Sequence, residues 1–145
     1  MALQQDSSLS MAELGDRIGL SLSACHRRVK MLEASGVIAG YMARLDRTKL
    51  GLEMQAFVEV KLASQSRAAF DAFEAAVRAL DAVIECHLIS GEFDVLLRIA
   101  VSGPAAYEDV FRNQLSELPG IAQTRTLLSM STIKPFRGFF IDTTR

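Results

Sequence analysis

The second half of the chain contains an internal repeat that restricts its possible folds. The segment "SRAAFDAF" at residues 66–73 resembles "GPAAYEDV" at residues 103–110, at an offset of 37 residues. Each segment begins a run in which apolar residues recur every three or four positions, which is typical of a helix. A strand is expected before and after each run. The predicted order is therefore strand, helix, strand, in two successive copies.

Four strands are expected, at residues 54–62, 83–90, 93–101 and 121–130. With the two helices they give the order β-α-β-β-α-β, which is the split unit of ferredoxin-like α+β folds. Such a unit covers one face of an antiparallel sheet with helices and leaves the other face in need of a partner. Several apolar residues are available for that face, which predicts dimerisation through the sheet. They are Phe57, Ile84, Cys86, Leu88, Leu96 and Leu127. The sequence does not decide which parity faces the helices.

The first forty residues predict two short helices joined by a tight turn. Ser10 and Glu13 have the spacing of a capping box, and Gly19 permits the left-handed backbone that ends a helix. Ser21 can cap the second helix. One stripe of that helix is expected to be buried, through Leu22, Cys25, Val29 and Leu32.

The opposite face of the second helix is polar and basic. It carries Ser23, His26, Arg27 and Lys30, with Arg28 at its edge. Guanidinium and ammonium groups donate to guanine edges and phosphates, and a serine hydroxyl can contact either. The capped helix and glycine turn that precede this face have the spacing of a helix-turn-helix. We therefore predict DNA binding, and a merely solvated basic face is the alternative.

Overall composition agrees with a DNA-binding domain joined to another kind of domain. The net charge is −1, but the first fifty residues are mildly basic and the remainder mildly acidic. No apolar run approaches the roughly 20 residues of a membrane helix, and no secretory leader is recognisable. Cys25 and Cys86 are far apart in sequence, which argues against a disulfide framework. We expect a cytoplasmic protein without a membrane partner.

The beginning of the chain is short for a DNA-binding head. Two helices normally need a third element to bury their far side, and only residues 1–5 are available for it. We expect either that the protein begins upstream of Met1 or that its head is reduced. The expected domains are a head with a wing or tether strand at 1–45, a linker at 46–53, and a sensing and oligomerisation domain at 54–145.

Several motifs in order carry a family resemblance. The chain resembles the Lrp/AsnC family of feast/famine transcriptional regulators through "GVIAGY", "LGL", "FVEVKL", "ECHLISGEFD" and "LPGIAQTRT". The resemblance covers about residues 2–134. It implies a helix-turn-helix, winged-helix-like head on double-stranded operator DNA and homodimers formed through the C-terminal sheets. It also implies further assembly, commonly to octamers, and an amino acid or related small molecule bound between dimers.

The same resemblance assigns roles to individual residues. It implies a recognition helix that begins at Ser21, which is itself among the implied DNA-binding residues. Base contacts are implied from Ser23, Ala24, His26 and Arg27, and phosphate contacts from Arg28 and Lys30. It implies effector contacts from Ser90, Gly91, Glu92, Phe93, Asp94, Thr126, Leu127, Leu128 and Ser129. From the residues alone, Gly91 could simply make a hairpin turn whose amides donate to Asp94.

Other classes of function have less support in the sequence. The adjacent pairs Cys25–His26 and Cys86–His87 point in different directions on a helix or strand, so no metal site or cofactor is expected. An enzyme, for example one resembling AsnC-like tetrapyrrole decarboxylases, would need converging acid–base groups that are not evident. The main alternative is a ligand-sensing or assembly module that has lost DNA binding through its reduced head. The effector, the operator and the sign of regulation are not decided.

Overall fold

The computed structural model describes residues 2–141, and their contacts divide the chain into two compact units. The larger unit is Leu45–Thr132, and the smaller unit combines the segments before and after it. Each unit has a hydrophobic core of its own. The domain boundaries expected near residues 45 and 53 stay a prediction.

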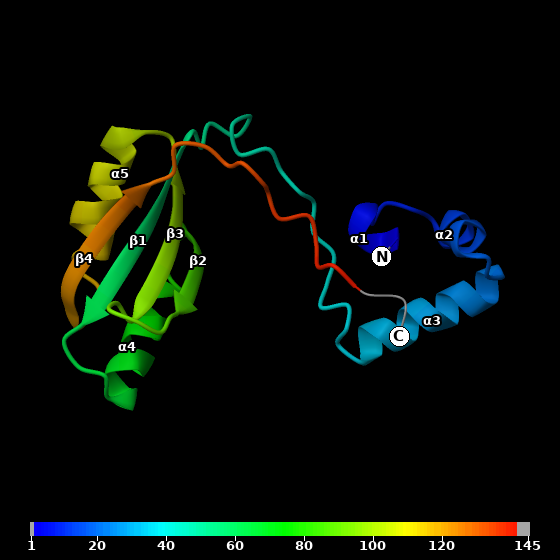
Figure 1. Ribbon diagram of the computed structural model, residues 1–145, viewed down its shortest axis with the longest axis horizontal. Helices are drawn as coiled ribbons and strands as arrows, with labels where there is room; N and C mark the ends of the chain where they lie inside the picture. The colour runs from blue at the N-terminus through cyan, green and yellow to red at the C-terminus, as the bar shows by residue number, and fades with distance from the viewer. Residues whose placement is uncertain (1, 142–145) are drawn as a thin grey trace. The chain divides into compact units, whose positions relative to one another are not determined.

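The larger unit has the predicted order of elements. These are β1 (Met54–Leu62), α4 (Arg67–Val77), β2 (Val83–Leu88), β3 (Val95–Val101), α5 (Pro104–Val110), the π-helical turn η1 (Phe111–Leu115) and β4 (Ile121–Leu128). The four strands form one antiparallel sheet in the order β2-β3-β1-β4 (Figure 1). The α+β class and the ferredoxin-like order of elements are therefore confirmed.

The core of this unit lies between one face of the sheet and the helices. Alternate residues of β1 and β3 are buried there, including Val58, Val60 and Leu97. Phe73 of α4 and Leu115 of η1 pack against them from the helical layer. The apolar residues that recur at strand spacing and those that recur at helical spacing therefore pack into one core, as the sequence pattern predicted.

The strand register decides which parity faces the helices. Cys86 lies opposite Leu97 and Leu88 lies opposite Val95, and both of these β3 residues are buried. Residues opposite one another share a face, so Cys86 and Leu88 lie on the helix side. Their expected place on the uncovered face was therefore wrong.

The uncovered face mixes apolar and charged side chains. Phe57, Leu96 and Leu127 lie on it, as expected for apolar members of this face. Ion pairs also cross it from strand to strand, between Arg98 and Glu85 at 2.8 Å and between Arg125 and Glu59.

The smaller unit contains the two predicted helices after a single helical turn. Its elements are α1 (Ala2–Gln5), α2 (Met11–Ile18) and α3 (Leu22–Ala34). Both halves of the capping box are formed, because the Glu13 amide donates to Ser10 Oγ at 3.2 Å and the Ser10 amide donates to Glu13 Oε2 at 2.8 Å. Gly19 ends α2 with φ of 69°, a left-handed conformation that glycine adopts without steric cost. None of the described helices is long and apolar enough to cross a membrane.

The head core is small and sits at the middle of α3. Leu14, Cys25 and Val29 are buried in it, and Ala2 and Leu3 of α1 pack against them. Leu22 and Leu32 are exposed, so the predicted four-residue stripe was wrong at both ends. The reason is geometric, since α1 and α2 are too short to cover the ends of a 13-residue helix.

The connection between the units contains no strand. Residues 37–46 lack regular secondary structure, so the expected wing or tether strand at 37–45 is not formed there. The expected linker at 46–53 contains a turn. The Thr48 amide donates to Asp46 Oδ1 at 3.0 Å, and Gly51 closes the turn with φ of 75°.

Gly15 permits the close approach of α2 to the turn before α3, and this gives a first prediction. A Cβ atom at this position would lie 2.8 Å from the backbone oxygen of Leu20. Gly15→Ala should therefore destabilise the head by about 1–3 kcal/mol, although alanine usually stabilises a helix by about 0.5–1 kcal/mol relative to glycine. Hydrogen exchange of the α2 and α3 amides would measure the loss.

Gly40→Ala is the matched control, because no atom lies within 4 Å of a Cβ built at Gly40. Equal exchange rates in the two variants would contradict the steric role of Gly15.

Candidate functional site

The exposed face of α3 begins at a well-formed helix cap. The Ala24 amide donates to Ser21 Oγ at 3.3 Å, and the Cys25 amide donates to the Ser21 carbonyl at 2.8 Å. Ser21 therefore orients the first turn of α3 as well as lying at its surface. Ser23 is exposed, with its hydroxyl 3.3 Å from that of Ser21. The predicted polar surface thus starts on a rigid turn.

Basic side chains continue this surface along the helix. His26, Arg27 and Arg28 are exposed, while Ala24 is half-buried. Within residues 2–141, no carboxylate forms an ion pair with Arg27 or Arg28. Their guanidinium groups are therefore available to an anionic partner.

Lys30 differs from the two arginines because it already has a partner. Its Nζ lies 2.8 Å from Glu33 Oε2, and the Tyr41 hydroxyl donates to Glu33 Oε1 at 3.0 Å. The hydrogen bond and charge of Glu33 raise the pKa of Lys30, and the bond from Lys30 lowers the pKa of Glu33. A phosphate would have to compete with Glu33 for this ammonium group.

Leu22 is a surface residue that sequence reasoning placed in the core. Its exposed fraction is 59%, and it lines an open depression together with Ser21, Ser23 and His26. An apolar side chain at this place can contact the methyl group of thymine. Its exposure could have been recognised from its position. Leu22 directly follows the capping residue Ser21, at the end of α3, where no other helix packs.

Asp94, in the turn between β2 and β3, is buried and fully engaged. Its carboxylate accepts hydrogen bonds from the Leu62 amide at 2.8 Å, Gln65 Nε2 at 2.9 Å and Lys61 Nζ at 3.2 Å. The Leu62 amide, with Lys61 and Gln65, lowers the pKa of Asp94. Three donors already satisfy this carboxylate, so it holds the turn against β1 and is not open to a ligand. No sequence pattern pointed to Lys61 or Gln65 in this role.

Arg125 covers the rest of this turn. Its guanidinium carbon lies 4.5 Å from the ring centroid of Phe93, which is buried. The same group pairs with Glu59 across the strands and lies 3.8 Å from Glu92. Of the predicted turn residues, Ser90, Gly91 and Glu92 are the exposed ones. Arg125 was not among the predicted site residues. It lies in β4 opposite Glu59 of β1, and opposite charges at paired positions of neighbouring strands are a recognisable pattern.

The second predicted segment, residues 126–129, lies elsewhere in the same sheet. The hydroxyls of Thr126 and Tyr107 are 2.6 Å apart on the helix side, and the Ser129 amide donates to the Gln55 carbonyl. Leu127 and Leu128 are exposed.

The two predicted effector segments do not meet within one chain. Val95 pairs with Val60 on one edge of β1, and Leu127 pairs with Phe57 on the other edge. Three positions along a strand correspond to about 10 Å. The width of β1 adds to this separation, so the two predicted segments lie apart in a single chain.

No metal site is formed by the described residues. Among residues 2–141, no group of three or more His, Cys, Asp and Glu side chains is arranged to hold an ion. Cys25 is buried in the head core and Cys86 is exposed on β2.

Comparisons with known proteins place both units in one family. A model described as the Lrp/AsnC ligand binding domain matches residues 55–139, and a model described as a winged helix-turn-helix DNA-binding domain matches residues 2–39. The leucine-responsive regulatory protein of Salmonella typhimurium is 40% identical over 141 residues, covering 97% of this chain and 86% of that protein.

Two solved structures are also similar over most of their length. One is an AsnC family transcriptional regulator from Agrobacterium tumefaciens, at 31% identity and a TM-score of 0.92, covering 99% of this chain and 94% of the other. The other is a transcriptional regulator from Neisseria meningitidis in complex with L-methionine, at 30% identity and a TM-score of 0.87, covering 92% and 86%.

The anchoring of Asp94 gives a prediction about stability and pH. Its native pKa lies below the ordinary value of 3.8, so the ionised carboxylate stabilises the fold above that pH. This contribution is lost as the pH falls through the lowered native pKa. Asp94→Asn should therefore lower the urea midpoint at pH 7, and the difference from the unmodified protein should shrink as the pH falls below 3.8.

Asp71→Asn is the control, because Asp71 is exposed and pairs only at 3.8 Å with Arg67. A midpoint difference for Asp94→Asn that is independent of pH would contradict the role assigned to its charge.

Proposed function

The chain belongs to the Lrp/AsnC family of transcriptional regulators, and we propose that the exposed face of α3 reads its operator in a major groove of double-stranded DNA. Members of this family regulate transcription and are not enzymes. The observation that carries the proposal is the capped start of α3, where Ser23, His26 and Arg27 are exposed on one rigid turn. A helix presented in this way can place its first residues against base edges.

Each residue of this face has a role in the proposal. Ser23, Ala24, His26 and Arg27 contact base edges, and Arg28 and Lys30 contact phosphates. Ser21 caps the helix and directs it into the groove. Two copies of α3 in a dimer would read half-sites about one helical turn, or a multiple of it, apart.

The proposed effector is an amino acid bound where two copies of the chain meet. The name of the Salmonella relative refers to leucine, and the Neisseria regulator was solved with L-methionine. Ser90, Gly91 and Glu92 of one copy would face Leu127, Leu128 and Ser129 of another, because these half-sites are separated in a single chain. Phe93, Asp94 and Thr126 would position the half-sites through their contacts with Arg125, β1 and Tyr107.

The proposed assembly begins with a dimer formed through the uncovered face of the sheet. Phe57, Leu96 and Leu127 supply its apolar part, and the cross-strand ion pairs satisfy the charges beside them. Dimers would join further, to an octamer. An effector bound between copies changes DNA binding by favouring one assembly over another. DNA is the partner of this assembly, so we expect it in the cytoplasm.

Substitution of the two arginines would separate base reading from phosphate binding. Arg27→Ala should weaken operator binding by about 1–3 kcal/mol and reduce the preference over a scrambled duplex. Arg28→Ala should weaken binding to both duplexes equally and reduce the salt dependence by about one phosphate contact. Fluorescence anisotropy at two salt concentrations, with the region upstream of the protein's own gene as operator, would measure both.

Arg67→Ala is the control, because Arg67 is an exposed arginine on α4 in the other unit. An unchanged operator preference in Arg27→Ala would remove Arg27 from the base-reading residues.

A complementation experiment would test whether the effector site is shared between copies. Glu92→Lys and Leu128→Arg each alter one half-site, so each variant alone should lose the shared site, measured by calorimetry as a fall in the number of L-methionine molecules bound per chain. Mixed assemblies contain some sites built from two unaltered halves and should recover about a quarter to a half of the binding sites, depending on geometry.

The control is a mixture of Glu92→Lys with Glu92→Arg, in which every site keeps an altered turn. Binding that is lost in each variant and not recovered on mixing would show that the site is not shared.

A further inference from the structure

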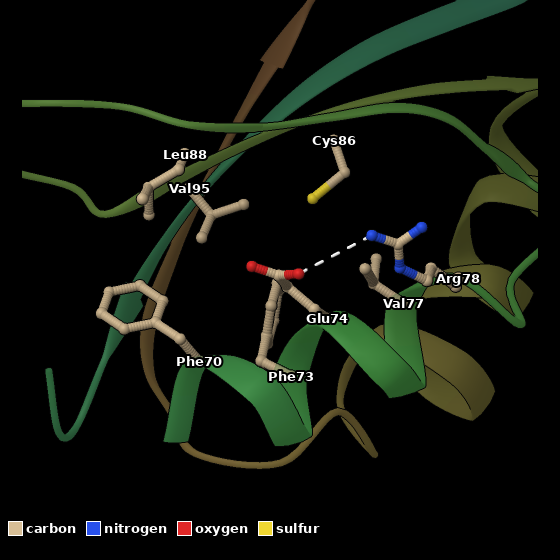
Figure 2. Close-up of a pocket in the computed structure, with 8 residues that line it drawn as sticks. All are labelled: Phe70, Phe73, Glu74, Val77, Arg78, Cys86, Leu88 and Val95. Atoms are coloured by element: carbon tan, nitrogen blue, oxygen red, sulfur yellow. Dashed lines mark ion pairs between the residues drawn. The ribbon is translucent and has the colours of Figure 1, made fainter. Parts of the chain in front are cut away.

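Strand β2 is an edge strand, and its helix side is only partly covered. Cys86 and Leu88 point to that side by register, yet both are exposed. Helix α4 buries Phe73 and Val77 in the core, but it does not pack closely on β2. A cavity of about 290 Å³ lies between α4 and β2 (Figure 2).

Apolar side chains from the core line part of this cavity. They are those of Phe73, Val77 and Val95. Phe70 of α4 and Leu88 of β2 also line it (Figure 2). The volume is at the lower limit of about 300–1,000 Å³ for ligand sites, so only a small ligand can be enclosed.

Two opposite charges stand at the rim of this apolar space. Glu74 Oε2 and Arg78 Nη2 are 3.7 Å apart on successive turns of α4, with exposed side-chain fractions of 54% and 79%. A pair so exposed contributes only about 0–1 kcal/mol, so a ligand can replace it at little cost. An ammonium group suits Glu74, and a carboxylate suits Arg78.

We propose that this cavity binds an apolar α-amino acid within a single chain, with its ammonium group at Glu74, its carboxylate at Arg78 and its side chain against Phe73 and Val77. An α-amino acid carries the two opposite charges on one carbon beside a single side chain, which matches the rim and the apolar surface together. The inference extends the amino-acid response proposed above and rests on it, but it concerns a second site that needs no neighbouring copy.

Cys86 provides a reporter for this site. In Figure 2 its sulfur points from β2 toward the rim, and it is the exposed one of the two cysteines. Burial and the neighbouring charge of Glu74 raise the pKa of the Cys86 thiol, while Arg78 opposes this. A ligand in the cavity would cover the thiol.

The experiment measures the rate at which a small disulfide reagent modifies Cys86, by mass spectrometry at fixed pH. Saturating L-methionine should slow the reaction by about tenfold or more, because exchange requires an accessible thiolate. Glycine has no side chain to fill the apolar space and should have little effect. Cys86→Ser should show no modification at this rate, because Cys25 is buried.

Two pairs of variants on the same helix test the geometry. Glu74→Gln and Arg78→Gln should abolish the protection by L-methionine. Arg67→Gln and Asp71→Asn should retain it, because they alter an even more exposed pair about two turns earlier that does not line the cavity. All four side chains are exposed, so the variants should fold alike.

Each outcome separates this inference from the proposed function. If L-methionine leaves the Cys86 rate unchanged but still binds in the complementation experiment, the cavity site is wrong and the shared site stands. If it protects Cys86 equally in Glu74→Gln and Arg78→Gln, a neighbouring copy covers β2 and the cavity site is wrong. If protection depends on the rim charges but complementation fails, the cavity site stands and the shared site is wrong.

Discussion

Strand β1 is hydrogen-bonded on both sides, and its register determines where the candidate sites of the larger unit lie. Pairing with β3 places Asp94 beside Val60, and pairing with β4 places Leu127 beside Phe57. A slip of one residue would exchange the two faces of the strand and turn Val58 and Val60 out of the core. Val58 and Val60 are buried beneath α4 and η1, and this burial fixes the register and with it the separation of the two proposed effector half-sites.

The charged groups of this unit differ in how fully their partners satisfy them. Asp94 is buried and accepts hydrogen bonds from three donors. These hydrogen bonds hold the turn between β2 and β3 in place. Glu74 and Arg78 make one long, exposed contact, so they are free to accept a better partner. A carboxylate in a ligand-binding sequence motif is therefore a candidate ligand contact only if its existing hydrogen bonds leave it a free lone pair.

The head depends on close backbone packing more than on the size of its core. Three buried side chains form that core, and α1 adds a single turn to it. The caps at Ser10 and Ser21 and the tight approach at Gly15 compensate by fixing the ends and the crossing of the two helices. This rigidity presents the first turns of α3, which is what recognition of base edges requires.

The amino-acid sequence by itself determined the order of elements, the helix caps and the polar face of α3. These follow from local patterns: the spacing of Ser10 and Glu13, the recurrence of Phe73 and Val77, and the conformational freedom of Gly19. Only the tertiary structure decided that Cys86 and Leu88 face the helices, that Leu22 is exposed and that Asp94 is saturated by Lys61, Leu62 and Gln65. Each of these depends on strand register or on which element reaches a given residue, and such contacts join positions that no local pattern relates.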